Sequence, residues 1–349
     1  MRVFIFIFLV ALAITALSTP FIRRFAVWAG FIDTPADRKI HREPTPLLGG
    51  LAIIGGALLA FLILWAALPK SVQAPRVIGV LLASSVVALT GLIDDRRRLP
   101  AYLKLAGQVL GFLIAIYFGI RVSLPVPEWL NYALTFVWLI GISNAMNFMD
   151  NMDGLSAGVS GVAASFILLL AVLNDQYLVA ALSAGILGAT LGFLRYNFKP
   201  ARIFMGDAGS LFLGFLLAVL CIQLRFPDNV NFVTWMVPLF IMGLPIFDTT
   251  LVIISRIRRG VNPLTTAGKD HVSHRIVRRG FTVTEAVLIL YLVGGAFGMA
   301  GLFITGASVG EGYALFTTAI VLGLIAIWRL ERRRDREARE ERQVPAAGE

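Results

Sequence analysis

Two adjacent aspartates, Asp94 and Asp95, follow an apolar run and precede three arginines. Adjacent carboxylates beside an apolar segment are costly, and they are typical of sites that handle a metal ion, a proton or a phosphate. The alternative is an interfacial charge cluster in which the arginines only pair with the aspartates. The pair alone does not decide between these interpretations, so the other polar segments must.

A second polar segment, NAMNFMDNMDG, places Asn144, Asn147, Asp150 and Asp153 three residues apart. If the preceding apolar helix continues through this segment, the spacing puts the four side chains roughly on one face. Carboxylate and amide oxygens suit a hard cation such as Mg²⁺, with Mn²⁺ as a substitute, and Mg²⁺ keeps coordination positions for substrate phosphates. The alternative is a polar helix end that only faces water.

Asp207 directly precedes another apolar run, in the segment RIFMGDAGS, between Gly206 and Gly209. An aspartate in this place is often only a helix N-cap. The same place also aims free backbone N–H groups and the positive end of a helix at an anion, which suits a metal-bound diphosphate. Phe204 is a candidate for stacking on a base, although an interfacial aromatic is the commoner role.

Two histidines, His271 and His274, stand three residues apart in the basic segment GKDHVSHRIVRRG. A zinc site needs more ligands, and His41 is the one remaining histidine in the sequence, with no cysteine nearby. Phosphate contacts by His271, His274 and Arg275 fit the segment better.

Two lysines are further candidates for binding an anion. Lys39 lies with His41 in the polar segment DTPADRKIHREPTPLLGG, before the second apolar run, and Lys104 lies just inside the fourth. A lysine inside an apolar run is expensive unless an anion meets it, so Lys104 is expected to contact one.

The elements that position these residues are transmembrane helices. The chain of 349 residues is 58% hydrophobic and 15% charged, with a mean hydropathy of +0.81, so the bilayer is its natural solvent. We predict an all-α, polytopic integral membrane protein with about eleven transmembrane helices. The expected spans lie near 3–19, 47–67, 75–93, 103–120, 129–147, 156–173, 178–194, 209–225, 232–254, 283–305 and 312–328.

Two local features are consistent with this organisation. The first span resembles a signal peptide, but it ends in ALSTP without a clear cleavage site, so we expect a retained helix. The single cysteine, Cys221, lies in an apolar run, which indicates neither disulfides nor a cysteine metal site. Residues 1–330 are expected to form one transmembrane catalytic domain, and residues 331–349 a charged cytoplasmic tail.

The net charge of +10 is mostly a topology signal rather than a sign of nucleic-acid binding. If the spans alternate, 26 of the 31 basic residues fall on one side of the membrane. The positive-inside rule then places the N-terminus outside and the C-terminus in the cytoplasm. The candidate site residues all lie on the cytoplasmic loops, and together they describe a Mg²⁺–diphosphate site. A membrane setting implies one lipidic and one water-soluble substrate.

The chain resembles the polyprenyl-phosphate N-acetylhexosamine-1-phosphate transferase family over nearly its whole length. The resemblance rests on five motifs in family order: DTPADRKIHREPTPLLGG, GLIDDRRRLPAYLKLAGQ, NAMNFMDNMDGLSAG, RIFMGDAGS and KDHVSHRIVRRG. The first and last motifs are closer to the initiating transferases of O-antigen (lipopolysaccharide) and wall teichoic acid synthesis than to the peptidoglycan phospho-MurNAc-pentapeptide translocase.

The resemblance implies a Mg²⁺-dependent enzyme of the bacterial inner (plasma) membrane with a cytoplasmic active site. A polyprenyl (undecaprenyl) phosphate would attack the β-phosphorus of a UDP-sugar, most simply UDP-GlcNAc, and release UMP. This would be the first membrane step of a cell-envelope polysaccharide. The oligomeric state is left open, with a homodimer among the alternatives.

The resemblance also implies roles for individual residues. Asp207 would bind Mg²⁺ with Asn147 as a second ligand, and Asp94 or Asp95 would position or deprotonate the polyprenyl phosphate. The remaining substrate contacts would come from Lys39, Lys104, Asn144, Asp150, Asp153, Asn197, Phe204, His271, His274 and Arg275. Two positions depart from the family pattern: Ser273 replaces a histidine, and Asn151 replaces a glycine. These departures weaken any inference about which N-acetylhexosamine is bound.

Three other classes of protein share single features with the chain. DNMDGLSAG resembles the start of the CDP-alcohol phosphotransferase signature, but Gly158 occupies its arginine position. Asp207 and Asp248 suggest an intramembrane aspartyl protease, but Phe204 stands where its motif requires glycine. A non-enzymatic transporter could use Asp248 and Lys104 as a coupling pair. Its site would lie at the bilayer midplane, whereas the candidate residues cluster at one face of the membrane. We expect Asp248 to support helix packing or the site.

Overall fold

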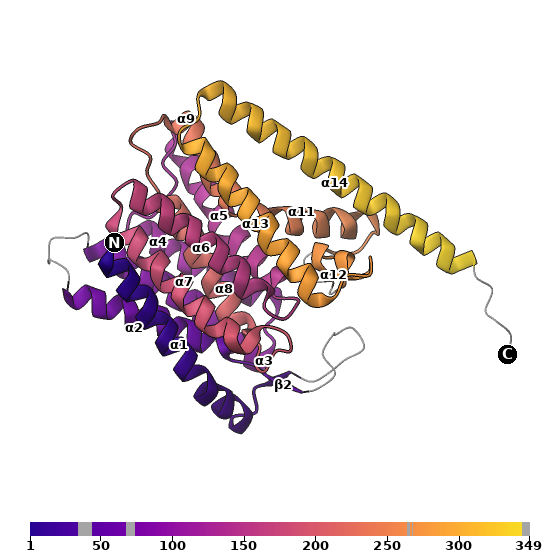
Figure 1. Ribbon diagram of the computed structural model, residues 1–349, viewed down its shortest axis with the longest axis horizontal. Helices are drawn as coiled ribbons and strands as arrows, with labels where there is room; N and C mark the ends of the chain where they lie inside the picture. The colour runs from indigo at the N-terminus through magenta and orange to yellow at the C-terminus, as the bar shows by residue number, and fades with distance from the viewer. Residues whose placement is uncertain (34–43, 68–73, 264–265, 267, 344–349) are drawn as a thin grey trace.

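The computed structural model describes residues 1–33, 44–67, 74–263, 266 and 268–343. In these ranges the chain forms helices and one two-stranded antiparallel sheet (Figure 1). The helices are α1 Arg2–Trp28, α2 Gly49–Ala67, α3 Ala74–Arg97, α4 Ala101–Tyr117, α5 Glu128–Met149, α6 Leu155–Leu173, α7 Tyr177–Asn197, α8 Gly206–Gln223, α9 Asn231–Thr234, α10 Met236–Ile241, α11 Gly243–Arg258, α12 Val272–Val277, α13 Val283–Thr305 and α14 Val309–Gln343, and the strands are β1 Ile32–Asp33 and β2 Thr45–Pro46.

The all-α, polytopic architecture is confirmed. Eight helices of the described chain are long and apolar enough to cross a membrane, and a bent pair, Asn231–Ile241 with Gly243–Arg258, brings the number to nine. Two shorter apolar helices, Gly49–Ile63 and Ala101–Tyr117, coincide with two further predicted spans. The number of spans that cross the bilayer and their orientation stay predictions.

One predicted span is interrupted. The sequence predicts a continuous helix near 232–254, but the chain bends by 69° between α10 and α11. Pro245 explains the break, because it has no backbone N–H and its ring would clash with the carbonyl of Ile241 in a continuous helix. Because of this bend, α11, which carries Asp248, does not continue along the axis of α10.

Helix α8 is buried along almost its whole length, so it forms the centre of the bundle. It packs against α2, α3 and α5. Glycines make this close approach feasible at the beginning of α8: a Cβ at Gly50 would overlap the backbone of Gly209, and one at Gly91 would overlap the backbone carbonyl of Asp207. The first turn of α8 is therefore held in place by backbone-to-backbone packing.

This packing gives a prediction with two opposite outcomes on one helix. Gly50→Ala should lower the free energy of unfolding by about 2–3 kcal/mol, because the backbone of Gly209 cannot move aside as a flexible side chain would. Gly55→Ala, whose Cβ would enter open space, should stabilise α2 by up to about 1 kcal/mol. Thermal unfolding in detergent measures both. Equal effects of the two substitutions would contradict the close approach of α2 and α8.

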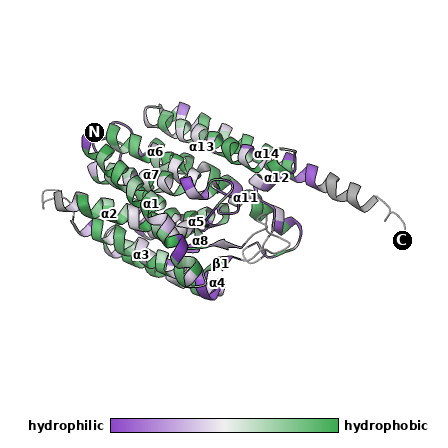
Figure 2. Ribbon diagram, turned by 60° about the horizontal axis from the view of Figure 1, so that its bottom comes forward, coloured by the Kyte–Doolittle hydropathy of each residue, from purple (hydrophilic) through white to green (hydrophobic). Residues whose placement is uncertain are grey.

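Loops that were predicted to lie on one side of the membrane meet at one end of the bundle. Strands β1 and β2 pair Ile32 with Pro46, and the backbone N–H of Phe204 donates to the Pro46 carbonyl at 2.8 Å. The Arg23 side chain donates to the Arg202 carbonyl at 3.0 Å, and Arg96 donates to the Ala29 carbonyl at 2.8 Å. Figure 2 shows hydrophilic residues gathered at the ends of helices around a mostly hydrophobic bundle.

The last helix, α14, leaves the bundle along much of its length (Figure 1). Only 6% of its apolar window is buried. It continues without a break past Leu330 to Gln343, so the first part of the predicted tail extends the last span as a helix. The separate role of residues 331–349 as a cytoplasmic tail stays a prediction.

Candidate active site

The candidate site is centred on Asp207, in the first turn of α8. Gly206 immediately before it adopts φ +75°, a left-handed conformation that a side chain would strain. One oxygen of Asp207 (Oδ2) lies 2.5 Å from Lys104 Nζ, and the other (Oδ1) accepts a hydrogen bond from Asn147 Nδ2 at 3.0 Å. Lys104 of α4 and Asn147 of α5 therefore both contact the half-buried carboxylate of Asp207 on α8.

The adjacent aspartates on α3 have different partners. Asp94 Oδ2 lies 2.8 Å from the same Lys104 Nζ, so one ammonium group bridges Asp94 and Asp207. Both oxygens of Asp95 instead accept backbone N–H groups at the start of α8, from Asp207 at 2.8 Å and Ala208 at 3.1 Å. Asp95 thus acts as an N-terminal anchor for α8, supplied by another helix.

The two predicted amide ligands also separate. Besides Asp207, Asn147 Nδ2 donates to Ser210 Oγ at 2.9 Å. Asn144 instead pairs with Gln108, with hydrogen bonds of 2.7 and 3.2 Å between the two amide groups. Equal spacing along α5 therefore does not give equal roles, because Asn144 ties α5 to α4 while Asn147 reaches α8.

The turn after α5 brings further carboxylates to this end of the bundle. Burial is the largest of the effects that raise the pKa of Asp150 to about 8, and the neighbouring carboxylates Asp207, Asp95 and Asp153 also contribute. Asp153 Oδ2 accepts the backbone N–H of Ala201 at 3.1 Å. Asp150 has no hydrogen-bond partner among the described residues, and its carboxyl group would be protonated at neutral pH unless a cation lies nearby.

Asn197 is buried and both ends of its amide are engaged. Its oxygen accepts the Gly154 N–H at 3.0 Å, and its nitrogen donates to the Ile203 carbonyl at 3.0 Å. Tyr291 also binds this turn, donating to the Gly154 carbonyl at 2.6 Å. Asn197 therefore supports the segment that leads to Phe204, which is half-buried. Contact of Asn197 or Phe204 with a nucleotide stays a prediction.

The two histidines lie at α12. His271 is buried, and its Nδ1 lies 2.7 Å from Asp248 Oδ2. The other oxygen of Asp248 accepts the Val272 N–H at 2.7 Å, so Asp248 orients the ring and anchors the start of α12. Ser273, at the position of the family's additional histidine, donates to Asn151 Oδ1 at 2.7 Å. The two positions that depart from the family pattern therefore contact each other.

Asp248→Asn should lower kcat/KM by about 10- to 100-fold, less than removal of the Asp207 charge. The amide can still accept the Val272 N–H, but it would present N–H to His271 Nδ1 and so reverse the tautomer of the ring. Steady-state kinetics measures the effect, and Thr250→Val on the exposed side of α11 is the control. A loss as severe as that of Asp207→Asn would give Asp248 a direct role.

His274 should be neutral at physiological pH. Burial is the largest of the effects that lower its pKa to about 4, and the neighbouring His271, Lys269 and Arg278 also contribute. The unfolded chain binds this proton near pH 6.5, so the stability due to neutral His274 is present above pH 6.5 and lost as pH falls toward 4. Thermal unfolding over this range should fall less steeply for His274→Gln than for the parent. Parallel curves would contradict the low pKa.

Another predicted substrate contact, Arg275, has partners other than Asp207. Arg275 is buried and donates to Glu331 Oε1 at 2.6 Å, to Ser255 Oγ at 3.0 Å and to the Asp270 carbonyl at 2.8 Å. These contacts join α12 to α11 and α14. Lys39 lies outside the described residues, so its predicted substrate contact stays a prediction.

The oxygen donors at Asp207 fit a hard divalent cation. In the described part of the chain, no three His, Cys, Asp or Glu side chains are already arranged as a metal cage. Mg²⁺ does not require one, because it binds through one or two carboxylates together with substrate phosphates and water. Asp207 and Asp94 share one cation, Lys104, and Asn147 could present oxygen rather than nitrogen by turning its amide.

Several supporting residues were not predicted individually. Gln108 lies one turn after Lys104, and Ser210 lies one turn after Asp207, so helical spacing from the candidate residues could have found both. Glu331 is different: it lies in an arginine-rich segment near the C-terminus, and only the tertiary structure brings it to Arg275.

Comparison with known proteins gives similarities over most of the chain. Residues 77–225 match the model of glycosyl transferase family 4. The chain is 33% identical to a probable undecaprenyl-phosphate N-acetylglucosaminyl 1-phosphate transferase of Bacillus subtilis (strain 168), over 91% of this chain and 90% of the relative. It is 33% identical to the decaprenyl-phosphate N-acetylglucosaminephosphotransferase of Mycolicibacterium smegmatis, over 92% and 88%. Identity to the phospho-N-acetylmuramoyl-pentapeptide-transferase of Bacillus cytotoxicus is 29%, over 85% and 95%.

Proposed function

Because the chain belongs to glycosyl transferase family 4, we propose that it transfers N-acetylglucosamine 1-phosphate from UDP-GlcNAc to a polyprenyl phosphate, releasing UMP. The product is a polyprenyl diphosphate sugar. The acceptor and the sugar follow the relatives, which are named for transfer of this group to undecaprenyl or decaprenyl phosphate. The same chemistry with another UDP-N-acetylhexosamine is the alternative.

The observation that carries this proposal is the single ammonium group of Lys104 between Asp94 and Asp207. It lies at the end of the bundle where the apolar spans give way to polar loops. A lipid phosphate from the bilayer and a nucleotide sugar from water can both reach such a place. The surrounding groups include a cation and several side-chain oxygens. Phosphoryl transfer requires such groups to neutralise the charge of the phosphates and to position them.

Mg²⁺ would be held by Asp207, with Asn147 and substrate oxygens completing its coordination, and it would supply charge neutralisation at the diphosphate. Lys104 would leave its carboxylate partners in part to meet diphosphate oxygens as substrate binds. The first turn of α8 would contribute the positive end of its dipole. Asp95 supports this arrangement by holding the backbone of that turn.

The different partners of the adjacent aspartates favour different roles. Asp94 touches Lys104 and accepts the Leu99 N–H at 2.5 Å, so it is the one that faces the lysine and could position the acceptor phosphate. Asp95 is occupied by backbone N–H groups and acts as a positioning residue. The acceptor phosphate is largely ionised near neutral pH, so positioning contributes more than proton removal.

The donor would lie between this carboxylate cluster and α12. Phe204 is the candidate for stacking on the base, and His271 with His274 would contact the sugar phosphate. Ser273 and Asn151 lie against each other beside these groups, where they could influence which N-acetylhexosamine is accepted.

The positive-inside rule supports a bacterial inner (plasma) membrane protein with its active site in the cytoplasm. The basic segments lie together, since Arg23 contacts the Arg202 carbonyl and Arg96 contacts the Ala29 carbonyl, so the rule applies to them as one group.

A panel of nucleotide sugars tests the substrate. Purified protein in detergent would be given Mg²⁺, undecaprenyl phosphate and, separately, UDP-GlcNAc, UDP-GalNAc or UDP-MurNAc-pentapeptide, and UMP release would be measured. UDP-GlcNAc should give the highest kcat/KM. Release from another donor alone would change the sugar but not the chemistry, and no UMP from any donor would contradict the proposal.

A further inference from the structure

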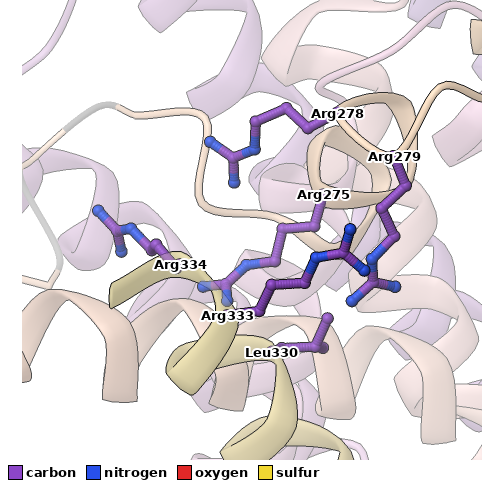
Figure 3. Close-up of a pocket in the computed structure, with 6 residues that line it drawn as sticks. All are labelled: Arg275, Arg278, Arg279, Leu330, Arg333 and Arg334. Carbon is purple, nitrogen blue, oxygen red and sulfur yellow. The ribbon is translucent and has the colours of Figure 1, made fainter. Parts of the chain in front are cut away.

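A small recess at the polar end of α14 is lined almost entirely by arginines. Figure 3 shows its six lining residues: Arg275, Arg278 and Arg279 from α12 and the segment after it, and Leu330, Arg333 and Arg334 from α14. Among the residues that the structure describes, the lining of this recess holds no acidic side chain. Five guanidinium groups brought together by two separate elements favour an anionic ligand.

Arg275 gives an independent indication that the recess binds a ligand that accepts hydrogen bonds. It is only 4% exposed, and its Nε and Nη2 donate to Asp270, Ser255 and Glu331. Its Nη1 is also buried but has no acceptor among the described residues. A buried charged donor without a partner is costly, so an anion that reaches Arg275 through the recess would be stabilised.

Two described acids that contact arginines of the recess, Glu331 and Asp270, are each shared with further arginines. Glu331 contacts Arg275 at 2.6 Å and Arg258 at 3.4 Å. Asp270 contacts three guanidinium groups, on Arg256, Arg259 and Arg334, at 2.6–3.4 Å. Among the side chains described up to Arg334, positive charge therefore exceeds negative charge around the recess.

The position of the recess along α14 indicates a lipid rather than a soluble anion. The apolar part of α14 ends at Trp328, whose ring lies 4.1 Å from the Arg332 guanidinium, and the basic residues follow at once. Tryptophan and arginine in this order mark the level of the lipid headgroups. A second recess on α14 adds apolar contacts from Ile254, Leu324, Ile327 and Trp328, and its polar lining is Arg258, Arg332 and Glu331, which is paired with Arg275 and Arg258.

We propose that the recess between α12 and α14, lined by Arg275, Arg278, Arg279, Arg333 and Arg334, binds the phosphate-bearing headgroup of an anionic phospholipid. The acyl chains lie along the apolar side of α14. This site is distinct from the cluster of Lys104 and Asp207 and does not depend on the proposed reaction. A headgroup held there bridges α12, which follows His271 and carries His274, to a helix that is otherwise thinly packed.

The test is lipid binding to the purified full-length chain, measured by native mass spectrometry with cardiolipin, and with phosphatidylcholine as the zwitterionic comparison. Arg278→Gln/Arg333→Gln should weaken cardiolipin binding by about 30-fold, from roughly 1 kcal/mol for each arginine near a headgroup. Arg24→Gln/Arg195→Gln removes the same charge from exposed arginines on α1 and α7 and should change binding by less than about threefold.

Three further outcomes decide the proposal. Equal weakening by both double variants would overturn it, since the effect would then come from overall charge. Binding of inorganic pyrophosphate that requires Arg278 and Arg333, without cardiolipin binding, would overturn the lipid as ligand. Unchanged cardiolipin binding in Asp207→Asn would support a site separate from the catalytic cluster, and loss of binding in that variant would contradict it.

Discussion

Asp207→Asn should lower kcat by about 10³-fold and raise the Mg²⁺ concentration needed for half-maximal activity. The carboxylate is the point where Lys104, Asn147 and the first turn of α8 meet, and an amide of the same shape keeps one acceptor but loses the charge. Loss of a preorganised charge at a phosphoryl-transfer centre costs about 10²–10³-fold, and loss of a metal ligand adds to it. Turnover at saturating substrate, titrated with Mg²⁺, measures both effects.

The matched control is Asp175→Asn. Asp175 lies in the loop between α6 and α7 with φ +54°, a conformation that asparagine tolerates well. Its substitution removes the same charge and should leave turnover and Mg²⁺ dependence unchanged. Thermal unfolding of both variants separates a catalytic loss from a folding defect. Near-normal turnover and Mg²⁺ dependence of Asp207→Asn would remove this residue from the metal site.

Lys104→Met should lower kcat by about 10²–10³-fold without raising the Mg²⁺ requirement. Methionine has a similar length but no charge, so Asp94 and Asp207 would lose the cation that they share and would repel each other. A divalent cation between them would then bind at least as tightly, while the diphosphate would lose its cationic contact. The two substitutions thus change opposite parts of the site, and Mg²⁺ titration distinguishes them.

Lys104→Arg keeps the charge on a planar, wider group and should retain intermediate activity. Lys199→Met removes an exposed lysine before α8 and should leave turnover unchanged. A weaker Mg²⁺ affinity in Lys104→Met would contradict the competition between the lysine and the metal for the same carboxylates.

Much of the fold could be predicted from hydropathy, because a spanning helix satisfies its own backbone and is readable from local composition. The resemblance to the transferase family is confirmed by the comparisons. The break between α10 and α11 was not predicted, although Pro238, Gly243 and Pro245 lie within the expected span. The mean hydropathy of a segment depends on its length and composition. It does not depend on whether a proline ring clashes with a backbone carbonyl one turn earlier.

The sequence also predicted several residues of the central cluster, but not the division of labour among them. Asp94 and Asp95 have the same chemistry and adjacent positions, and they differ only in which neighbour they meet: a lysine on α4 or backbone N–H groups on α8. Asn144 and Asn147 differ in the same way. Such differences depend on how the helices pack against one another, and the spacing of residues along one helix does not predict this.

For Asp248, the sequence indicated a supporting role but not the residues that it contacts. Its position inside an apolar span indicated support for the site or for packing. The structure brings it to His271 across the loop that follows α11, where it also anchors the start of α12. Only the tertiary fold joins these two residues, which are 23 positions apart.

The most direct test of the central claim is the fate of the donor's β-phosphate. UDP-GlcNAc labelled with ³²P in the β-phosphate would be incubated with the purified protein, Mg²⁺ and undecaprenyl phosphate, and the lipid and aqueous phases would be separated. We expect the label to move into the lipid, together with one equivalent of unlabelled UMP in water. Label that stays in water as UDP while the sugar enters the lipid would mean glycosyl transfer, and it would contradict the account of this site.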